Sequence, residues 1–161
     1  MHERGRTMKA WRCEYGSDHV IIHAPTASKA RAQRWRELRD CCPDIGFHEI
    51  RVVRAAHDDV HLPDEHPIAT QLSHEERGRI LHAYGYSNRP GRPEDWGYRN
   101  HYCTAPDCTV MAHMTTLGIF RGPAGVDKSG DTPGWSGAFW YLTDLGEHVA
   151  RSLIPLYGGQ P

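Results

Sequence analysis

The stretch from Ala105 to Ile154 constrains the fold of this chain more than any other part of the sequence. Just after Pro106, four apolar residues recur at the spacing of one helical face, and they are Val110, Met111, Met114 and Leu117. Gly118 follows where a residue of left-handed conformation would end a helix. The sequence therefore predicts a short amphipathic helix over 107–117.

Two strands are predicted after this helix. Ile119 and Phe120 begin a strand, a Gly-rich loop covers 121–137, and the aromatic run 138–143 is typical of a half-buried strand. We read the two strands as a hairpin. We expect Phe120 and Phe139 to lie in paired antiparallel strands, packed against the C-terminal helix, and to form one compact lobe with Met111 and Leu117.

A last helix completes the pattern. Thr143 or Asp144 can cap it, Pro155 ends it, and its buried face consists of Leu145, Val149 and Leu153. The order helix, strand, long loop, strand, helix is that of a winged helix, with the loop as the wing.

Two short segments also resemble known proteins. Residues 139–151, FWYLTDLGEHVAR, resemble the wing strand and following helix of bacterial winged-helix regulators. Residues 98–106, followed by a helix with a Leu-Gly end, are similar to small uncharacterised proteins carried by phages and prophages of bacteria with GC-rich genomes. The resemblance covers roughly the last half of the chain. It implies a winged-helix fold and a phage origin, but it implies no activity.

The N-terminal part has a different pattern. Apolar and polar residues alternate over 11–15 and again over 20–24, which predicts a β-hairpin. A helix over 26–42 and a strand over 47–55 follow. The sequence thus predicts a ββαβ unit over 8–56.

A polar, acidic segment with two prolines separates the two parts, and we interpret 57–72 as a linker. Ser73 and Glu76 then form a capping box at the start of a helix. The predicted fold class is α+β, with the ββαβ unit followed by a winged-helix-like domain over 73–157.

Composition limits the choice of function. The chain has 19 basic and 20 acidic side chains, so it lacks the excess of positive charge that sequence-independent nucleic-acid binding favours. Its five cysteines and the absence of an apolar leader or spanning segment favour reduced thiols. We therefore expect a protein of the host bacterial cytoplasm that does not contact membranes.

Candidate contact residues come from the predicted helix 107–117, the wing, the basic helix 26–42 and the loop before residue 105. They are Lys29, Arg31, Arg36, Arg89, Arg92, Trp96, Arg99, Thr109, His113, Arg121 and Lys128. The predicted recognition helix lacks the Arg, Lys, Asn and Gln side chains that make strong base contacts, so sequence-specific DNA binding and protein contact both stay open. The basic helix could also be a solvated face with internal ion pairs.

Aromatic residues cluster near the same loop, and they are Tyr84, Tyr86, Trp96, Tyr98, Tyr102 and Trp135. With Arg92 and Arg99 nearby, this composition is typical of a protein interface. The alternative is that the rings fill a small core. Exposed tryptophan would favour the interface.

A zinc site would need the ligand set His101, Cys103, Cys108 and His113, but these residues lack the tight spacing of zinc knuckles. The 12 histidines are scattered, and no catalytic or nucleotide-binding motif occurs in the sequence. We therefore expect a non-enzymatic protein that uses no cofactor or metal.

The leading hypothesis is a phage-encoded nucleic-acid-binding accessory or regulatory protein. The alternative is a phage protein that binds and inhibits a host protein complex, such as an anti-CRISPR. The expected partner is DNA or a host protein complex, and a homodimer is left open.

Overall fold

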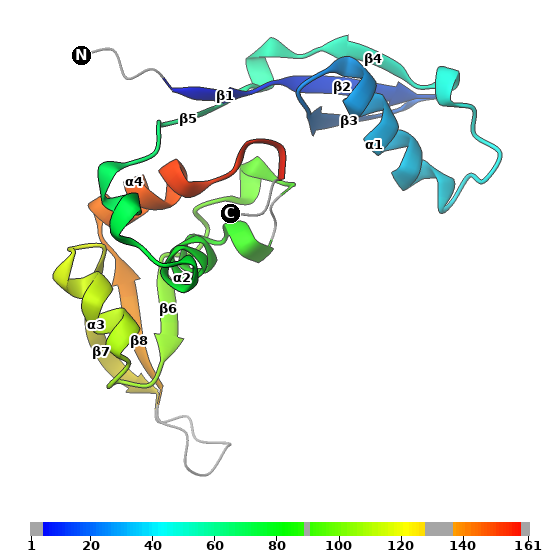
Figure 1. Ribbon diagram of the computed structural model, residues 1–161. Helices are drawn as coiled ribbons and strands as arrows, with labels where there is room; N and C mark the ends of the chain where they lie inside the picture. The colour runs from blue at the N-terminus through cyan, green and yellow to red at the C-terminus, as the bar shows by residue number, and fades with distance from the viewer. Residues whose placement is uncertain (1–4, 89–90, 128–136, 159–161) are drawn as a thin grey trace. The chain divides into compact units, whose positions relative to one another are not determined.

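A computed structural model describes residues 5–88, 91–127 and 137–158, which form two compact units (Figure 1). One unit contains 5–62 together with 156–158, and the other contains 63–155. Both units combine helices with small antiparallel sheets, so the chain has the predicted α+β class.

The N-terminal unit contains the predicted ββαβ order. Strands β2 (Ala10–Tyr15), β3 (Asp18–His23) and β4 (Arg51–Arg54) form an antiparallel sheet in the order β3-β2-β4. Helix α1 (Ala27–Arg39) packs against these strands, and a short 3-10 helix η1 (Phe47–Glu49) precedes β4. Their shared core is Cys13, Ile22, Ala24, Ala30, Leu38, Ile45 and Ile50.

The segment that we expected to be a linker is structured. It contains strand β5 (Val60–Leu62), which pairs with β1 (Arg6–Met8), and the 3-10 helix η3 (Pro67–Gln71); the short η2 (Ala56–Asp58) precedes them. The physical reason is hydrogen bonding to the N-terminal sheet, because Asp59 accepts from the backbone N–H of Ala10 on β2 and from the Arg54 guanidinium on β4.

The unit boundaries also differ from those we expected. The chain enters the C-terminal unit at residue 63, not 73, and it leaves at residue 155. The 3-10 helix η6 (Leu156–Gly158) belongs to the N-terminal unit, where the Tyr157 hydroxyl accepts a hydrogen bond from the N–H of Lys9 at 3.1 Å.

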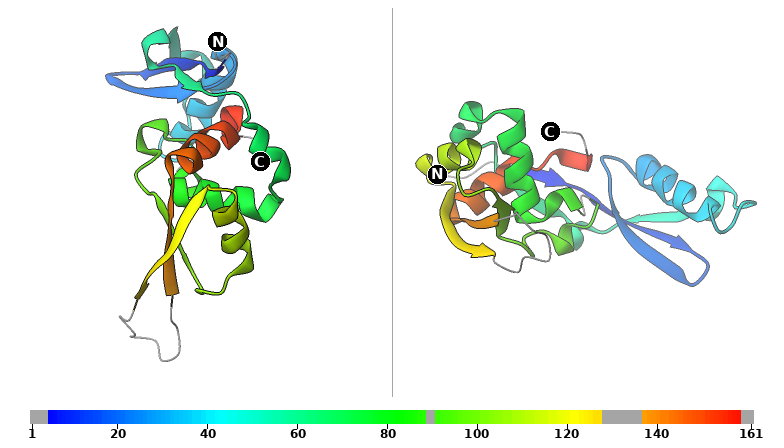
Figure 2. Two further views of the ribbon diagram at one scale, coloured as in Figure 1. Left: turned by 90° about the vertical axis from the view of Figure 1, so that its left-hand side faces the viewer. Right: turned by 90° about the horizontal axis from the view of Figure 1, so that it is seen from below.

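The C-terminal unit is built on a three-stranded antiparallel sheet in the order β6-β8-β7 (Figure 2). Its elements in chain order are α2 (His74–Tyr84), η4 (Tyr86–Asn88), η5 (Pro93–Asp95), β6 (His101–Thr104), α3 (Thr109–Thr116), β7 (Phe120–Asp127), β8 (Gly137–Leu142) and α4 (Asp144–Leu153). Helix α2 packs against β6, β8 and α4, and α3 packs against β7.

Two details depart from the predicted elements. Strand β7 continues to Asp127 through the region where we expected a loop from Arg121, with register shifts on both sides of Ala124. The shifts follow Gly122–Pro123, where proline has no N–H to donate to the ladder. The rest of the predicted loop, 128–136, lies outside the described residues.

The structure confirms the predicted pairing of the two strands. Phe120 and Phe139 lie in paired antiparallel strands of the C-terminal unit, which also contains Met111 and Leu117. Phe120 and Met111 are buried, whereas Phe139 and Leu117 are half-buried. Ala138, Trp140 and Leu142 are buried, with Trp140 only 1% exposed. Because side chains of a strand alternate between faces, burying Trp140 turns Phe139 to the opposite face.

Thr143 fixes the start of α4 to the turn between α3 and β7. Its hydroxyl donates to the carbonyl of Gly118 at 2.6 Å and accepts from the N–H of Gly146, while its N–H donates to the carbonyl of Ile119 at 3.0 Å. A Cβ on Gly146 would lie 2.1 Å from the Ile119 carbonyl oxygen. This contact explains the glycine in the Leu-Thr-x-x-Gly pattern.

Gly146→Ala should therefore lower the free energy of unfolding of the C-terminal unit by about 1–3 kcal/mol, because the new methyl group must displace backbone. Gly78→Ala is the matched control, since a Cβ at this α2 position meets nothing within 4 Å. The control should raise stability by about 0.5–1 kcal/mol. Urea unfolding followed by tryptophan fluorescence measures both, and equal stability of Gly146→Ala and the wild type would contradict the account.

Candidate functional site

A buried carboxylate joins α2 to α3. Glu76 is buried, forms the predicted capping box with Ser73, and pairs through Oε1 with Nδ1 of His113. Burial alone would raise the pKa of Glu76, but the bonds from His113 and Ser73 outweigh it and lower the pKa. Since His113 pairs with this carboxylate, one of the two candidate contact residues on α3 has a structural partner.

One turn further along α2, Arg79 contacts the beginning of α3. Its Nη1 lies 3.2 Å from Sγ of Cys108, its Nη2 donates to Glu75 at 2.7 Å, and its guanidinium lies over the Tyr102 ring at 5.2 Å. Cys108 occupies the position just before the first residue of α3. A thiol there meets both a cation and the N–H groups of a helix N-terminus.

These surroundings favour the thiolate form of Cys108. Burial acts to raise the pKa of this thiol, but bonds from the backbone N–H groups of Met111 and Val110 and from the Arg79 guanidinium together lower it. The opposite holds for Cys13 in the N-terminal core, where burial raises the pKa to about 11. The two thiols should therefore differ strongly in reactivity.

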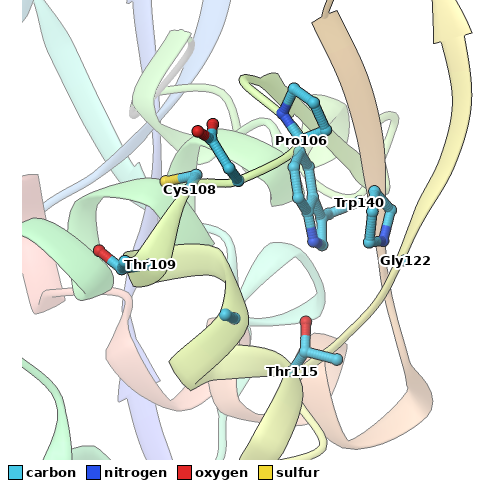
Figure 3. A pocket seen from close by; sticks show the side chains of 9 residues that line it. Pro106, Cys108, Thr109, Thr115, Gly122 and Trp140 are labelled. Carbon is cyan, nitrogen blue, oxygen red and sulfur yellow. The ribbon is translucent and has the colours of Figure 1, made fainter.

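A pocket of about 280 Å³ lies beside Cys108 (Figure 3). Figure 3 shows the Trp140 indole beside Pro106 and Gly122, while Cys108, Thr109 and Thr115 approach from α3 and its start. The lining is mostly apolar. The pocket presents no carboxylate–histidine pair, because the Glu76 and His113 pair is not among its lining residues.

The exposed side of α3 is poorly equipped to read bases. Thr109, Ala112 and Thr116 are exposed, yet Thr116 bonds back to the carbonyl of Ala112 at 3.1 Å and His113 is paired with Glu76. None of the α3 side chains is an Arg, Lys, Asn or Gln. The helix predicted to be a recognition helix therefore has only weak means of direct readout.

A different surface gathers rings and a cation, on the side of the sheet opposite α2. His101 pairs across the ladder with Tyr141, and its ring lies 5.7 Å from Phe139 and 6.1 Å from Tyr141. Arg121, on β7, is exposed and lies 5.9 Å from the Tyr141 ring centroid. We call His101, Phe139, Tyr141 and Arg121 the outer sheet face.

The contacts of Tyr102 identify the side of the sheet that carries α2, because its ring lies against Arg79 and His82 of that helix. Tyr102 and Trp140 are partners in the ladder, so the buried residues of β8 share this side. Neighbouring strand residues point to opposite sides, which places His101, Phe139 and Tyr141 on the other one. Burial and the nearby Arg99 lower the pKa of His101.

The basic side chains of α1 are mostly engaged within the N-terminal unit. Arg31 donates to the carbonyl of Ile50 and lies over Phe47, while Arg36 bonds to the carbonyl of Ala32. Arg34 is buried and pairs with Asp18. Lys29 is exposed and lies in the first turn of α1, where its N–H bonds to the capping Thr26.

The aromatic loop is partly core and partly surface. Tyr86 is buried against Trp96 with ring centroids 5.2 Å apart, whereas Tyr98 is 57% exposed and accepts a bond from Asn88 at 3.0 Å. Arg92 pairs with Glu94 and Asp95, and Arg99 lies 3.4 Å from Nε2 of His82. The candidates Arg89 and Lys128, and the ring of Trp135, lie outside the described residues.

The structure does not assemble the zinc set. Cys108 is engaged by Arg79 and His113 by Glu76, while His101 and Cys103 lie on β6. Among the residues that the structure describes, no three His, Cys, Asp or Glu side chains are arranged to hold a metal ion.

Sequence reasoning missed the Arg79–Cys108 contact and the outer sheet face. The first joins residues 29 apart in sequence, and no local motif marks it. The second had a usable signal in the alternation of β8, but aromatic residues occur on both faces of that strand.

Comparisons with protein-family models, curated proteins and solved structures give no match. No helix in the described ranges is long and apolar enough to cross a bilayer.

The thiol assignment predicts selective alkylation. At pH 7, iodoacetamide should modify Cys108 well before Cys13, and Arg79→Gln should slow the reaction of Cys108 by about threefold or more because the thiolate loses its cation. Arg77→Gln is the matched control, since this α2 guanidinium bonds to Ala69 and Glu65 instead. Peptide mass spectrometry reads each rate, and an unchanged rate in Arg79→Gln would refute the assignment.

The Glu76 carboxylate predicts a pH-dependent stability. Glu76→Gln should lower the free energy of unfolding by about 1–3 kcal/mol near neutral pH, because a buried charge-assisted bond is lost. Since the folded-state pKa lies below the ordinary 4.5, this contribution is present above pH 4.5 and disappears as the pH falls through the folded-state value. Denaturant titrations from pH 7 to about 3 should show the two proteins converging in acid. A gap that stays constant would contradict the role given to the carboxylate.

Proposed function

We propose that this chain is a nucleic-acid-binding accessory or regulatory protein with a winged-helix-like C-terminal unit. The order α2, β6, α3, β7, β8, α4 and the sheet order β6-β8-β7 support the winged-helix interpretation. Only α3 lies between β6 and β7, so the two-helix motif that usually precedes the wing is reduced to one helix. The short resemblance to phage proteins supports a phage origin.

The observation that carries the proposal is the outer sheet face. It presents an arginine and aromatic rings together. Arginine and aromatic side chains are the groups that contact phosphates and bases. By contrast, the acidic side chains Glu75 and Glu76 of α2 lie close to α3, through Arg79 and His113.

Binding through this face fits the charge of the chain. With a net charge of −1, the chain has no overall excess of positive charge to attract a phosphate backbone. A small number of phosphate contacts, supported by contacts to bases, is the mode of binding that such a composition allows. We propose binding and not catalysis as the activity.

The second candidate function is attachment to a host protein complex, as an inhibitor of the anti-CRISPR kind. One observation favours it: Tyr98 is largely exposed beside the packed Tyr86 and Trp96 pair. Exposed tyrosines on rigid turns are frequent anchors of protein interfaces. Stoichiometric capture of a host protein, with no binding to nucleic acid, would favour this candidate.

A salt titration tests the leading proposal. Fluorescence anisotropy with labelled duplex and single-stranded oligonucleotides should show binding at about 20 mM salt and a slope of log K against log salt between about −1 and −3, as expected for few phosphate contacts. Absence of binding to either form at low salt would refute the proposal.

A further inference from the structure

The outer sheet face has the geometry of a stacking surface. Its three rings, His101, Phe139 and Tyr141, lie with centroids 5.7 to 6.5 Å apart. All three are half-buried, so each keeps part of its ring open to solvent. The rings come from β6 and from the central strand β8, which pairs with β6 on one side and with β7 on the other.

The buried residues on the opposite side of β8 hold the orientation of these rings. Trp140, between Phe139 and Tyr141 in sequence, is buried, and so are Ala138 and Leu142. A rotation of β8 that turned its outer rings inward would have to expose this buried set. The stacking surface is therefore preorganised, which reduces the ordering cost of binding a flexible ligand.

The side chains of the outer sheet face indicate which class of ligand it can bind. Arg121 lies over Tyr141, and His101 adds a further ring beside Phe139 and Tyr141. Rings beside a cation complement bases attached to phosphates. Duplex bases are stacked on each other and show only their edges, whereas a single strand offers base faces to protein rings.

We infer that the outer sheet face binds single-stranded nucleic acid, with bases stacked on Phe139, Tyr141 and His101 and a phosphate contacted by Arg121. This inference rests on the proposed function and names the ligand class and the site. It also assigns α3 no part in base recognition.

The experiment compares labelled oligothymidylate and oligouridylate of about 15 nucleotides with a duplex of equal length, in anisotropy titrations at low salt. Both single strands should bind more tightly than the duplex, and the ratio of the two tells whether DNA or RNA is preferred. Phe139→Leu with Tyr141→Leu should weaken single-strand binding by about fivefold or more, because leucine retains apolar burial but cannot stack.

Phe47→Leu is the matched control, because Phe47 is a 41% exposed ring with Arg31 at 5.6 Å, but in the N-terminal unit. Its affinity should equal that of the wild type. Circular dichroism verifies that each variant is folded.

Arg121→Gln gives a second readout if the double variant is unstable, since Arg121 is exposed on β7. It should reduce the salt slope for single strands by about 0.7. Arg51→Gln, whose side chain is 73% exposed in the N-terminal unit, should leave the slope unchanged.

The outcomes separate the inference from the proposed function. A wild type that prefers duplex, or folded variants at 121, 139 and 141 that bind single strands as the wild type does, would overturn the stacking surface while leaving nucleic-acid binding in place. Absence of any nucleic-acid binding by the wild type would overturn both.

Discussion

The central position of β8 is the constraint on which the C-terminal unit depends. This strand pairs with β6 on one side and β7 on the other, so its register determines the faces of all three. Burial of Trp140 sets that register, because a shift by one residue would expose the indole and bury Phe139 and Tyr141 instead. The burial of Trp140 thereby determines both the core side of the sheet and the aromatic face opposite it.

The helices add a second layer of constraint, which engages most of the charged groups near α3. Glu76 holds His113, Arg79 holds Cys108, and Thr143 ties the start of α4 to the turn after α3. Groups that satisfy each other inside the unit are less available to a ligand. On the sheet of this unit, Arg121 is exposed and has a ring beneath it. The outer sheet face therefore offers a ligand more accessible contact groups than α3 does.

Local motifs were predictable from the sequence, whereas pairings between distant residues were not. The Ser73–Glu76 capping box, the hairpin of β2 and β3, and the start of α4 follow from patterns within a few residues. The sequence left the buried face of β8 open, because Phe139 and Trp140 are both aromatic and only packing decides which is buried. The β1–β5 pair escaped prediction because strands of three residues show almost no alternation. The contact between Arg79 and Cys108 depends on the packing of α2 beside α3, which no local pattern encodes.

Photochemical crosslinking to an oligonucleotide containing 5-iodouracil, followed by mass spectrometry of the crosslinked peptides, tests the central claim most directly. If the register of β8 presents a stacking surface, crosslinks will form at Phe139, Tyr141 or His101 and not at Trp140. Crosslinks confined to α3, at residues 109–116, would contradict the account, because they would place the bases on the helix that the structure shows to be poor in base-reading side chains.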